Sequence, residues 1–383
     1  LTRNDTDGAL TVVIDLGGDA SAAEYSFSAG TGTASKLRVV LPDGQASLDV
    51  IVTAVDDDIN EVAETLRLSL ATAAAYVING TTNNSDITLT SEDRSAVNLA
   101  LGFEPILELS SLDGSNGFVL NGIDTGDRAG GAVSSAGDVN GNGFSDLLIG
   151  AYRADPNVQS AAGESYVVFG GSNIGSTGTI ELSALDGSNG FVINGVAEGD
   201  RAGFAVSDVG DVNGDGLTDL LIGAYRADPN GNSAAGASYV VFGRSTGFGS
   251  SLELSALDGT NGFVLNGSAV EDYSGYTVSS AGDVNGDGLA DLILGVPDAD
   301  PNGRSGAGVS YVIFGRSSFA SSLELSDLDG TNGFVLNGSR AGDDTGVSVS
   351  SAGDVNGDGM DDLIIGARNA DPNGDSAAGV SYV

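Results

Sequence analysis

The sequence contains no cysteine, histidine or tryptophan, and Lys36 is its single lysine. Without cysteine the chain cannot form disulfides, thiolate zinc sites or a cysteine nucleophile, and without histidine it cannot form a Ser-His-Asp triad. Basic residues are scarce, since 14 stand against 53 acidic ones, for a formal net charge of −39 at pH 7. Binding to nucleic acid or to an anionic membrane surface is therefore disfavoured, because the main electrostatic contribution would be repulsive.

Long apolar runs are missing as well. No segment approaches the ~18 consecutive apolar residues of a membrane-spanning helix, and no signal peptide is visible. The chain begins at Leu1 rather than Met and stops at Val383 inside a repeat, so we expect it to be a piece of a longer protein. An acidic, cysteine-free chain with 60 glycines fits a bacterial secreted or cell-surface protein, where calcium is plentiful.

Four nine-residue loops share one pattern of oxygen-bearing side chains. In Asp211–Asp219 these side chains stand at positions 1, 3, 5 and 9, a glycine at position 6 permits a sharp turn, and position 7 can offer its carbonyl. Several oxygens, at least two of them anionic, are what a hard cation such as Ca²⁺ requires. The predicted Ca²⁺ ligands are Asp138, Asn140, Asn142, Phe144 and Asp146; Asp211, Asn213, Asp215, Leu217 and Asp219; Asp283, Asn285, Asp287, Leu289 and Asp291; and Asp354, Asn356, Asp358, Met360 and Asp362.

These loops differ from EF-hand loops, which end in a bidentate Glu at position 12 and lie between helices. Position 12 here falls inside a short apolar run that predicts a buried strand, so each loop should join two strands. The alternative is that Asp, Asn and Gly simply form turns. Four copies with one spacing favour cation binding, since a turn needs only one or two of these residues. Asn142 replaces an aspartate, so the first site should bind most weakly.

Residues 1–96 form a region without this repeat. Short apolar segments alternate there with Gly-rich or Asp-rich turns, which predicts an antiparallel β-sandwich. Three adjacent aspartates, Asp56 to Asp58, repel one another, and a bound cation would compensate them, with solvated turns as the alternative.

This region resembles an N-terminally truncated Calx-beta domain, a calcium-binding sandwich. The matching features are Glu24-Tyr25, the acidic run from Asp56 to Glu64, and Glu92-Asp93. The resemblance implies a calcium cluster lined by Glu24, Asp56, Asp57, the carbonyl of Ile59, Glu61, Glu64, Glu92 and Asp93.

Residues 97–383 consist of four repeats, the last of them truncated. The first aspartates of the four loops are 73, 72 and 71 residues apart. The second copy offers four strand candidates, Phe191–Asn194, Ala205–Val209, Asp219–Ala224 and Ser238–Phe242, and no segment has a helical period. The prediction is an all-β chain whose repeats form β-propeller blades.

The repeats resemble the FG-GAP repeats of integrin alpha subunits. In the second copy the match comprises Gly203 to Ser207, the Asp211–Asp219 loop and Leu221 to Ala224. The resemblance implies a propeller of seven blades in which each loop binds one Ca²⁺ through the side chains at positions 1, 3, 5 and 9 and the carbonyl at position 7. Four repeats do not close such a ring, so we expect it to be incomplete in this chain.

The sequence thus predicts a calcium-binding extracellular module for adhesion or recognition, without catalytic activity. Its structural Ca²⁺ ions would tie strands together, and its ligand would be a cell-surface or matrix protein or a glycan. Two alternatives stay open, a calcium-stiffened structural stalk and an accessory region of a larger secreted enzyme. No nucleophile–base pair can be named within the chain.

Two smaller features complete the predictions. The Ala-Asp-Pro-Asn segments that start at residues 154, 227, 299 and 370 are predicted turns, with an additional cation site as the alternative. Four arginines, Arg128, Arg153, Arg201 and Arg226, are expected to pair with nearby carboxylates.

Overall fold

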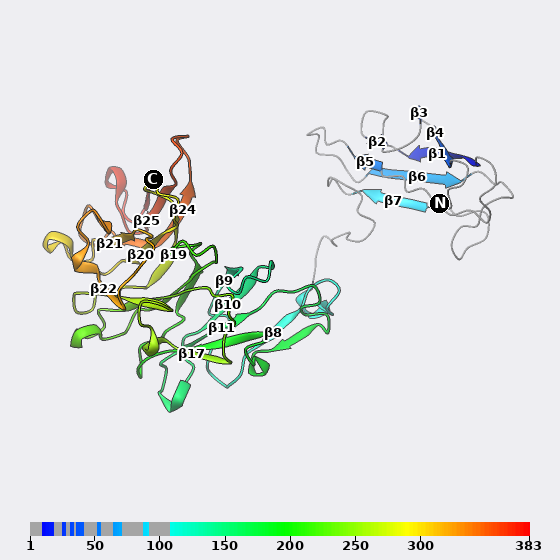
Figure 1. Ribbon diagram of the computed structural model, residues 1–383. Helices are drawn as coiled ribbons and strands as arrows, with labels where there is room; N and C mark the ends of the chain where they lie inside the picture. Colours follow the sequence, from blue (N-terminus) through cyan, green and yellow to red (C-terminus); the bar gives the residue numbers. More distant parts are fainter. Residues whose placement is uncertain are drawn as a thin grey trace. The chain divides into compact units, whose positions relative to one another are not determined.

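The computed structural model describes residues 108–383 throughout and, before them, the strand residues alone (Figure 1). The chain divides into two compact units, Leu1–Glu108 and Leu109–Val383. Among the described residues there are strands and short 3₁₀ turns but no α-helix, as predicted. No described segment is a helix that could cross a membrane.

The first unit contains two antiparallel sheets, described here by their backbone pairing. A five-stranded sheet has the order β3-β4-β1-β6-β7, and β2 pairs with β5 in a second sheet. The strands are β1 (Leu10–Gly18), β2 (Tyr25–Phe27), β3 (Thr31–Thr33), β4 (Lys36–Leu41), β5 (Val52–Ala54), β6 (Glu64–Leu70) and β7 (Ile87–Ser91). The antiparallel strands of this region are confirmed, whereas the Calx-beta resemblance stays a prediction.

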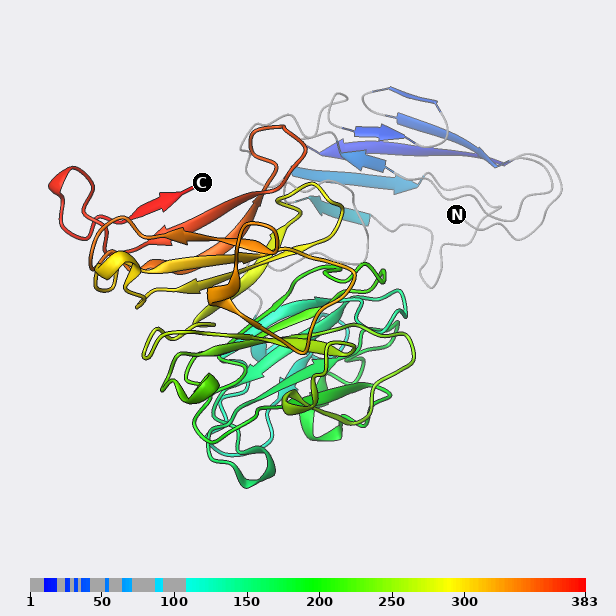
Figure 2. The same ribbon diagram turned by 60° about the vertical axis from the view of Figure 1, so that its left-hand side comes forward.

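The second unit consists of four successive blades (Figure 2). The first blade is β9 (Ala132–Gly137), β10 (Asp146–Ala151), β11 (Glu164–Val168) and β13 (Gly190–Asn194). The second is β14 (Ala205–Asp208), β15 (Leu220–Ala224), β16 (Ala237–Val241) and β18 (Gly262–Asn266). The third is β19 (Thr277–Gly282), β20 (Asp291–Val296), β21 (Val309–Ile313) and β23 (Gly333–Asn337), and the fourth is β24 (Thr345–Gly353), β25 (Asp362–Ala367) and β26 (Val380–Tyr382). All-β propeller blades are thus confirmed, and these four blades do not close a ring.

Each of the first three blades takes its outer strand from the following sequence repeat. The four strands predicted in the second repeat all form, but β13 pairs with β11 of the first blade, whereas the other three belong to the second. A further short strand then adds in parallel: β17 (Ser251–Glu253) pairs with β13, and β22 (Ser322–Glu324) pairs with β18. In the same way β12 (Thr179–Glu181) pairs with β8 (Val119–Asn121). Successive blades are therefore interlocked by the chain itself.

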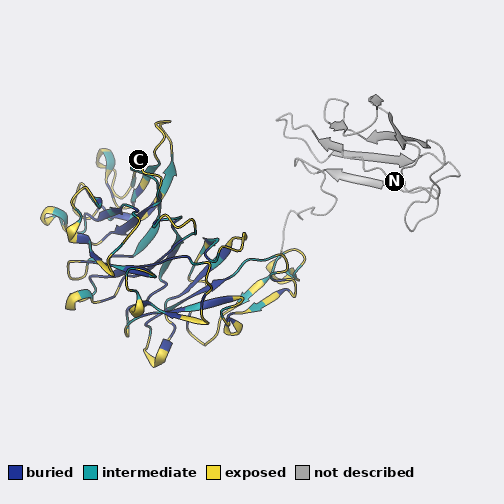
Figure 3. Cartoon of the chain, viewed as in Figure 1, coloured by how far each residue is buried: buried dark blue, intermediate teal, exposed yellow. Residues whose placement is uncertain are grey.

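The hydrophobic core lies between neighbouring blades. All five residues of β15 are buried, because the sheet of the second blade is covered on both faces (Figure 3). Phe191 stacks on Phe248 with ring centroids 4.1 Å apart, and Phe263 repeats this contact with Phe319 one repeat later. A Cβ atom added at Gly150 would lie 2.1 Å from the Gly203 oxygen, so glycine there allows the backbones of adjacent blades to touch. Burial of each such aromatic or aliphatic side chain stabilises the fold by about 1.5–3 kcal/mol.

Candidate cation-binding loops

The four predicted loops connect the first and second strands of each blade. They lie between β9 and β10, β14 and β15, β19 and β20, and β24 and β25. Position 12 falls within the second strand of each pair, for example at the buried Ile222 of β15. The predicted strand–loop–strand placement is confirmed, and an EF-hand is ruled out at these loops.

The carboxylate at position 1 organises its own loop through backbone amides. Asp211 Oδ1 accepts hydrogen bonds from the N–H groups of Gly214 (2.7 Å) and Asp215 (3.1 Å), and Asp211 Oδ2 accepts one from Gly216 (2.8 Å). Asn213 Oδ1 accepts a bond from Asp215 N–H, and Asp215 Oδ1 accepts one from Leu217 N–H. The other three loops repeat these hydrogen bonds, except that the first loop lacks the bond from the Gly141 N–H to the carboxylate at position 1. The predicted ligands at positions 1, 3 and 5 therefore share one preformed turn.

The aspartate at position 9 lies in a different environment. Asp219 is fully buried, and its two carboxylate oxygens accept hydrogen bonds from Val212 N–H (3.0 Å) and Gly243 N–H (2.9 Å). Burial raises the pKa of Asp219 to about 8, and the neighbouring charges of Asp215 and Asp211 add to the effect. Asp146 and Asp291 are likewise buried, and desolvation raises the pKa of each to about 6. The protein alone therefore compensates the charged form of these aspartates poorly.

The donor set fits a hard cation in its chemistry. All side-chain candidates are carboxylate or amide oxygens. An oxygen that accepts a single N–H, such as Asp211 Oδ2, retains a further lone pair for a cation, whereas Asp211 Oδ1 already accepts two. The main-chain oxygens at position 7 accept no hydrogen bond from any described residue. However, among the described residues no three acidic side chains stand close enough together to hold a metal ion between them. The loops thus place the predicted ligands along one turn without gathering the carboxylates of positions 1, 5 and 9 at a point.

Backbone hydrogen bonds join the loops of neighbouring blades into a chain. The position-8 N–H of one loop donates to the position-1 carbonyl of the loop before it: Thr218 to Asp138 (3.3 Å), Ala290 to Asp211 (3.0 Å) and Asp361 to Asp283 (3.0 Å). A second bond runs from Arg244 N–H to the Val139 carbonyl (2.8 Å) and from Arg316 N–H to the Val212 carbonyl (2.9 Å). Sequence reasoning missed this connection because backbone amides leave no signal in the sequence.

The first loop keeps the geometry with one charge fewer. Asn142 Oδ1 accepts the hydrogen bond from Phe144 N–H at 2.8 Å, as Asp215 Oδ1 does from Leu217 N–H in the second loop. In addition, Asn142 Nδ2 donates to the Gly170 carbonyl at 3.2 Å. The side-chain amide of Asn142 thus makes the same hydrogen bond in the turn as a carboxylate does, but it brings no negative charge to the loop.

The predicted Calx-beta cluster is placed only in part. Glu64 begins β6, where its backbone pairs with Ser91 of β7. The other seven candidates, Glu24, Asp56, Asp57, Ile59, Glu61, Glu92 and Asp93, lie outside the described residues.

The Ala-Asp-Pro-Asn segments form turns, as predicted. A short 3₁₀ turn begins at the proline of each, at Pro156, Pro229, Pro301 and Pro372. The aspartate before each proline accepts a backbone N–H six residues later, for example Asp228 Oδ1 from Ala234 at 2.6 Å. An additional cation at these turns stays a prediction without a test.

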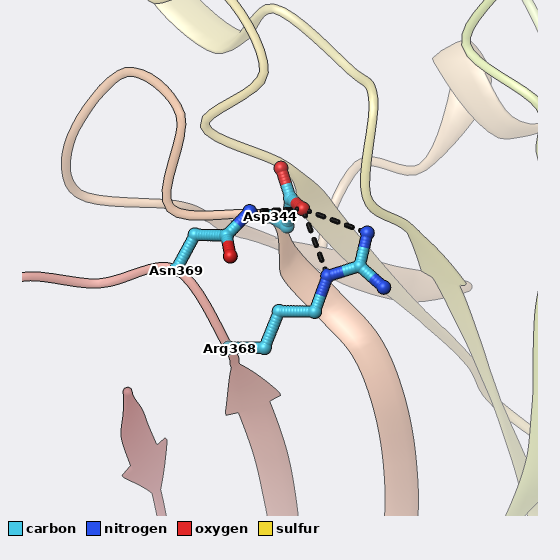
Figure 4. Close-up of polar contacts among 3 residues, drawn as sticks. All are labelled: Asp344, Arg368 and Asn369. Carbon is cyan, nitrogen blue, oxygen red and sulfur yellow. Dashed lines mark hydrogen bonds and ion pairs between the residues drawn. The ribbon is translucent and has the colours of Figure 1, made fainter. Parts of the chain in front are cut away.

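Among the described residues the four arginines pair with no carboxylate, so that prediction is wrong. Arg128 and Arg201 donate to the hydroxyl groups of Tyr152 and Tyr225, and Arg153 and Arg226 have no side-chain hydrogen bond or ion pair among the described residues. The ion pair that does form in this part of the chain joins Arg368 to Asp344 at 3.0 Å, with Asn369 as a further donor (Figure 4). Aromatic faces compete with carboxylates for a planar guanidinium, which counting charges does not reveal.

Comparison with known proteins agrees with the repeat boundaries. The FG-GAP repeat model matches residues 129–168, 205–241, 274–313 and 345–383. The bovine (Bos taurus) phosphatidylinositol-glycan-specific phospholipase D is 31% identical over 198 residues, which cover 52% of this chain and 22% of the relative. Integrin alpha-4 of Xenopus laevis is 31% identical over 166 residues (43% of this chain, 14% of the relative), and integrin alpha-PS2 of Drosophila melanogaster is 29% identical over 239 residues (61% and 15%). The chain therefore spans less than a quarter of these relatives.

Proposed function

Because the chain carries four FG-GAP repeats of the kind found in integrin alpha subunits, we propose that it is a calcium-binding module for adhesion or recognition outside the cell or at its surface. The observation that carries the calcium proposal is the position-1 to position-9 loop, repeated four times with the same hydrogen bonds. Ca²⁺ would be held by the side chains at positions 1, 3, 5 and 9 and by the free carbonyl at position 7.

The role of the ion would be structural. When bound, the Ca²⁺ ion supplies the positive charge that compensates the buried carboxylates at position 9. The loops bond to one another from blade to blade, so an ion in each loop would stiffen the ends of the first two strands in all four blades. Affinities in the range of roughly 10⁻⁴–10⁻³ M are expected for such extracellular sites.

Thermal unfolding tests this proposal directly. The midpoint is measured in EDTA and then across a Ca²⁺ titration to roughly 10 mM, with Mg²⁺ as the control; each site at ten times its Kd adds about 1.4 kcal/mol. A large Ca²⁺-selective rise is expected, and Asp211→Ala, Asp283→Ala and Asp354→Ala should each reduce it. Asp375→Ala is the matched control, because that exposed carboxylate makes no side-chain hydrogen bond among the described residues. A midpoint indifferent to Ca²⁺ would leave the loops as turns only.

A second candidate is an accessory region of a larger enzyme. It is favoured by the match to a phospholipase D over 52% of this chain. The chain itself has no histidine or cysteine, so any catalytic group of those types would have to come from elsewhere in such a protein. Phospholipase D activity that requires this region joined to another domain would support this candidate over a free-standing adhesion module.

A further inference from the structure

An aromatic ladder runs across the ends of the first two blades. Tyr152, which follows β10, lies 5.4 Å from Phe204 between ring centroids, and Phe204 lies 4.3 Å from Tyr225, which follows β15. Tyr276 of the third blade extends the ladder, 5.2 Å from Phe204. These rings therefore form one continuous line of contacts across adjacent blades, with Tyr225 buried and the other three partly buried.

Four arginines surround this ladder. The guanidinium carbons of Arg128 and Arg153 lie 6.0 and 5.8 Å from the centre of the Tyr152 ring. Those of Arg201 and Arg226 lie 5.7 and 5.6 Å from the centre of the Tyr225 ring. Residues 108–383 contain nine arginines and no lysine, so almost half of the positive charge of this region is collected at one place. We call these four arginines with Tyr152, Phe204 and Tyr225 the arginine–tyrosine patch.

The fold does not require arginine at these positions, as the other two blades demonstrate. Arg128 and Arg201 have φ of 60° and 61°, and the equivalent Tyr273 and Asp344 adopt the same left-handed conformation at 58° and 54°. An L side chain rarely adopts this conformation, and arginine has no special aptitude for it.

The fold does not require arginine at the positions of Arg153 and Arg226 either. The N–H groups of Arg153 and Arg226 donate to the Asp127 and Asp200 carbonyls, and Asn369 makes the same bond to Asp343 in the fourth blade. In the third blade the equivalent position is Asp298. One backbone therefore accepts arginine, asparagine or aspartate here, and the concentration of arginine on two blades needs a reason outside folding.

Part of the patch borders a pocket of about 340 Å³ between the first two blades. Arg153 and Arg201 line it together with Asp127 and Asp155. The two aspartates are already engaged by backbone amides, Asp127 by that of Asp124 and Asp155 by that of Ala161. Asp127 is also buried, whereas Arg153 is exposed and its side chain has no hydrogen bond or ion pair among the described residues. The exposed Arg153 guanidinium is therefore the cationic group of this pocket most available to a ligand, beside the exposed carboxylate of Asp155.

We propose that the arginine–tyrosine patch docks an acidic segment of a partner protein, an inference that rests on the recognition role proposed above. Carboxylates of Asp or Glu pair with the planar guanidinium fork through two parallel hydrogen bonds, and the tyrosine rings hold the forks in place. The large negative charge elsewhere on the chain is screened beyond about 8 Å at physiological ionic strength. The exposed guanidinium groups of Arg153 and Arg226, which have no side-chain hydrogen bond or ion pair among the described residues, thus favour an acidic peptide over a basic or neutral one.

The test is the binding of fluorescein-labelled octaglutamate to the full chain, measured by fluorescence anisotropy at 150 mM NaCl with Ca²⁺ present. The variant is Arg153→Gln with Arg226→Gln, because neither side chain makes a hydrogen bond that folding needs. Arg340→Gln is the single-charge control away from the patch. We expect the double variant to raise the Kd at least tenfold, each single variant to raise it by less, and Arg340→Gln to change it less than twofold.

Three results would overturn the inference. One is the absence of octaglutamate binding, and another is an equal loss in Arg153→Gln and Arg340→Gln, which would indicate general charge attraction. The third is patch-dependent binding of dextran sulfate with no binding of octaglutamate, which would assign the patch to a sulfated polysaccharide. The Ca²⁺ dependence of the unfolding midpoint, measured on the same samples, shows separately whether the calcium proposal stands.

Discussion

The second and fourth loops have nearly the same sequence but different surroundings. The second loop is bonded to the first on one side and to the third on the other, whereas the fourth has a bonded neighbour, the third, on one side among the described residues. Asp219 is fully buried, but its counterpart Asp362 is partly exposed, and β25 is less buried than β15. The environment of a loop, and so the cost of its negative charge, is therefore determined by the adjacent blades.

The largest difference should appear when the position-9 aspartate is removed. Asp219→Ala leaves the N–H groups of Val212 and Gly243 without an acceptor in a buried site, at about 1–3 kcal/mol each. We expect a loss of about 3–5 kcal/mol in the free energy of unfolding, against about 1–2 kcal/mol for Asp362→Ala, where water can replace the carboxylate. Urea unfolding in EDTA at pH 4 measures both, because the raised pKa of Asp219 leaves its carboxyl protonated there and removes most of the desolvation cost that the substitution would relieve at pH 7. Equal losses would show that burial by a second neighbouring blade does not change how much the position-9 aspartate contributes to the free energy of unfolding.

A pH effect should follow from Asp200, which lies between the first two blades and is not a predicted ligand. Burial raises its pKa from 3.8 to about 6, because the charged form is desolvated. The folded state therefore holds the proton more tightly than the unfolded state, so the stability lost through this group grows as the pH rises from about 4 to 6 and is complete above pH 6. Stability should increase as the pH falls from 7 towards 4, by about 3 kcal/mol at most.

The control for this effect is Asp200→Asn, which retains an acceptor for Ala197 N–H. This variant should be more stable than the wild type at pH 7 and should lose the part of the pH dependence that comes from Asp200. A wild type and a variant with parallel stability profiles between pH 4 and 8 would contradict the assignment.

Local features of the fold were predictable from the sequence, and non-local ones were not. The loop Asp211–Asp219 and the strand Leu220–Ala224 follow from glycine placement, oxygen spacing and a short apolar run. The assignment of β13 to the preceding blade depends on pairing with β11, and no residue of either strand encodes that choice alone. Likewise, Arg201 near Asp200 suggests an ion pair in sequence, but the fold brings the Tyr225 hydroxyl to its guanidinium instead.

The chain of loop-to-loop bonds predicts that Ca²⁺ sites influence their neighbours. Asp283→Ala alters the third loop, whose position-1 carbonyl is bonded to Asp361 N–H and whose Ala290 N–H is bonded to the Asp211 carbonyl. We expect this change to weaken Ca²⁺ binding at the second and fourth loops roughly fivefold, a coupling of about 1 kcal/mol. Asp354→Ala should weaken the third loop but not the second. Calorimetric titration of both variants measures this, and loss of a single site with unchanged remaining affinities in each would show independent loops.

The smallest effect should come from restoring the missing charge of the first loop. Asn142→Asp gives this loop the same acidic residue as Asp215 in the second, at the loss of the hydrogen bond from Asn142 Nδ2 to the Gly170 carbonyl. An added carboxylate among the ligands strengthens Ca²⁺ binding, whereas that partly exposed hydrogen bond contributes only about 0.5–1.5 kcal/mol. We therefore expect a net gain of about threefold in the affinity of the weakest site in a calorimetric titration. A reduced affinity would mean that the bond to Gly170, which ties the loop to the end of β11, matters more to the site than its charge does.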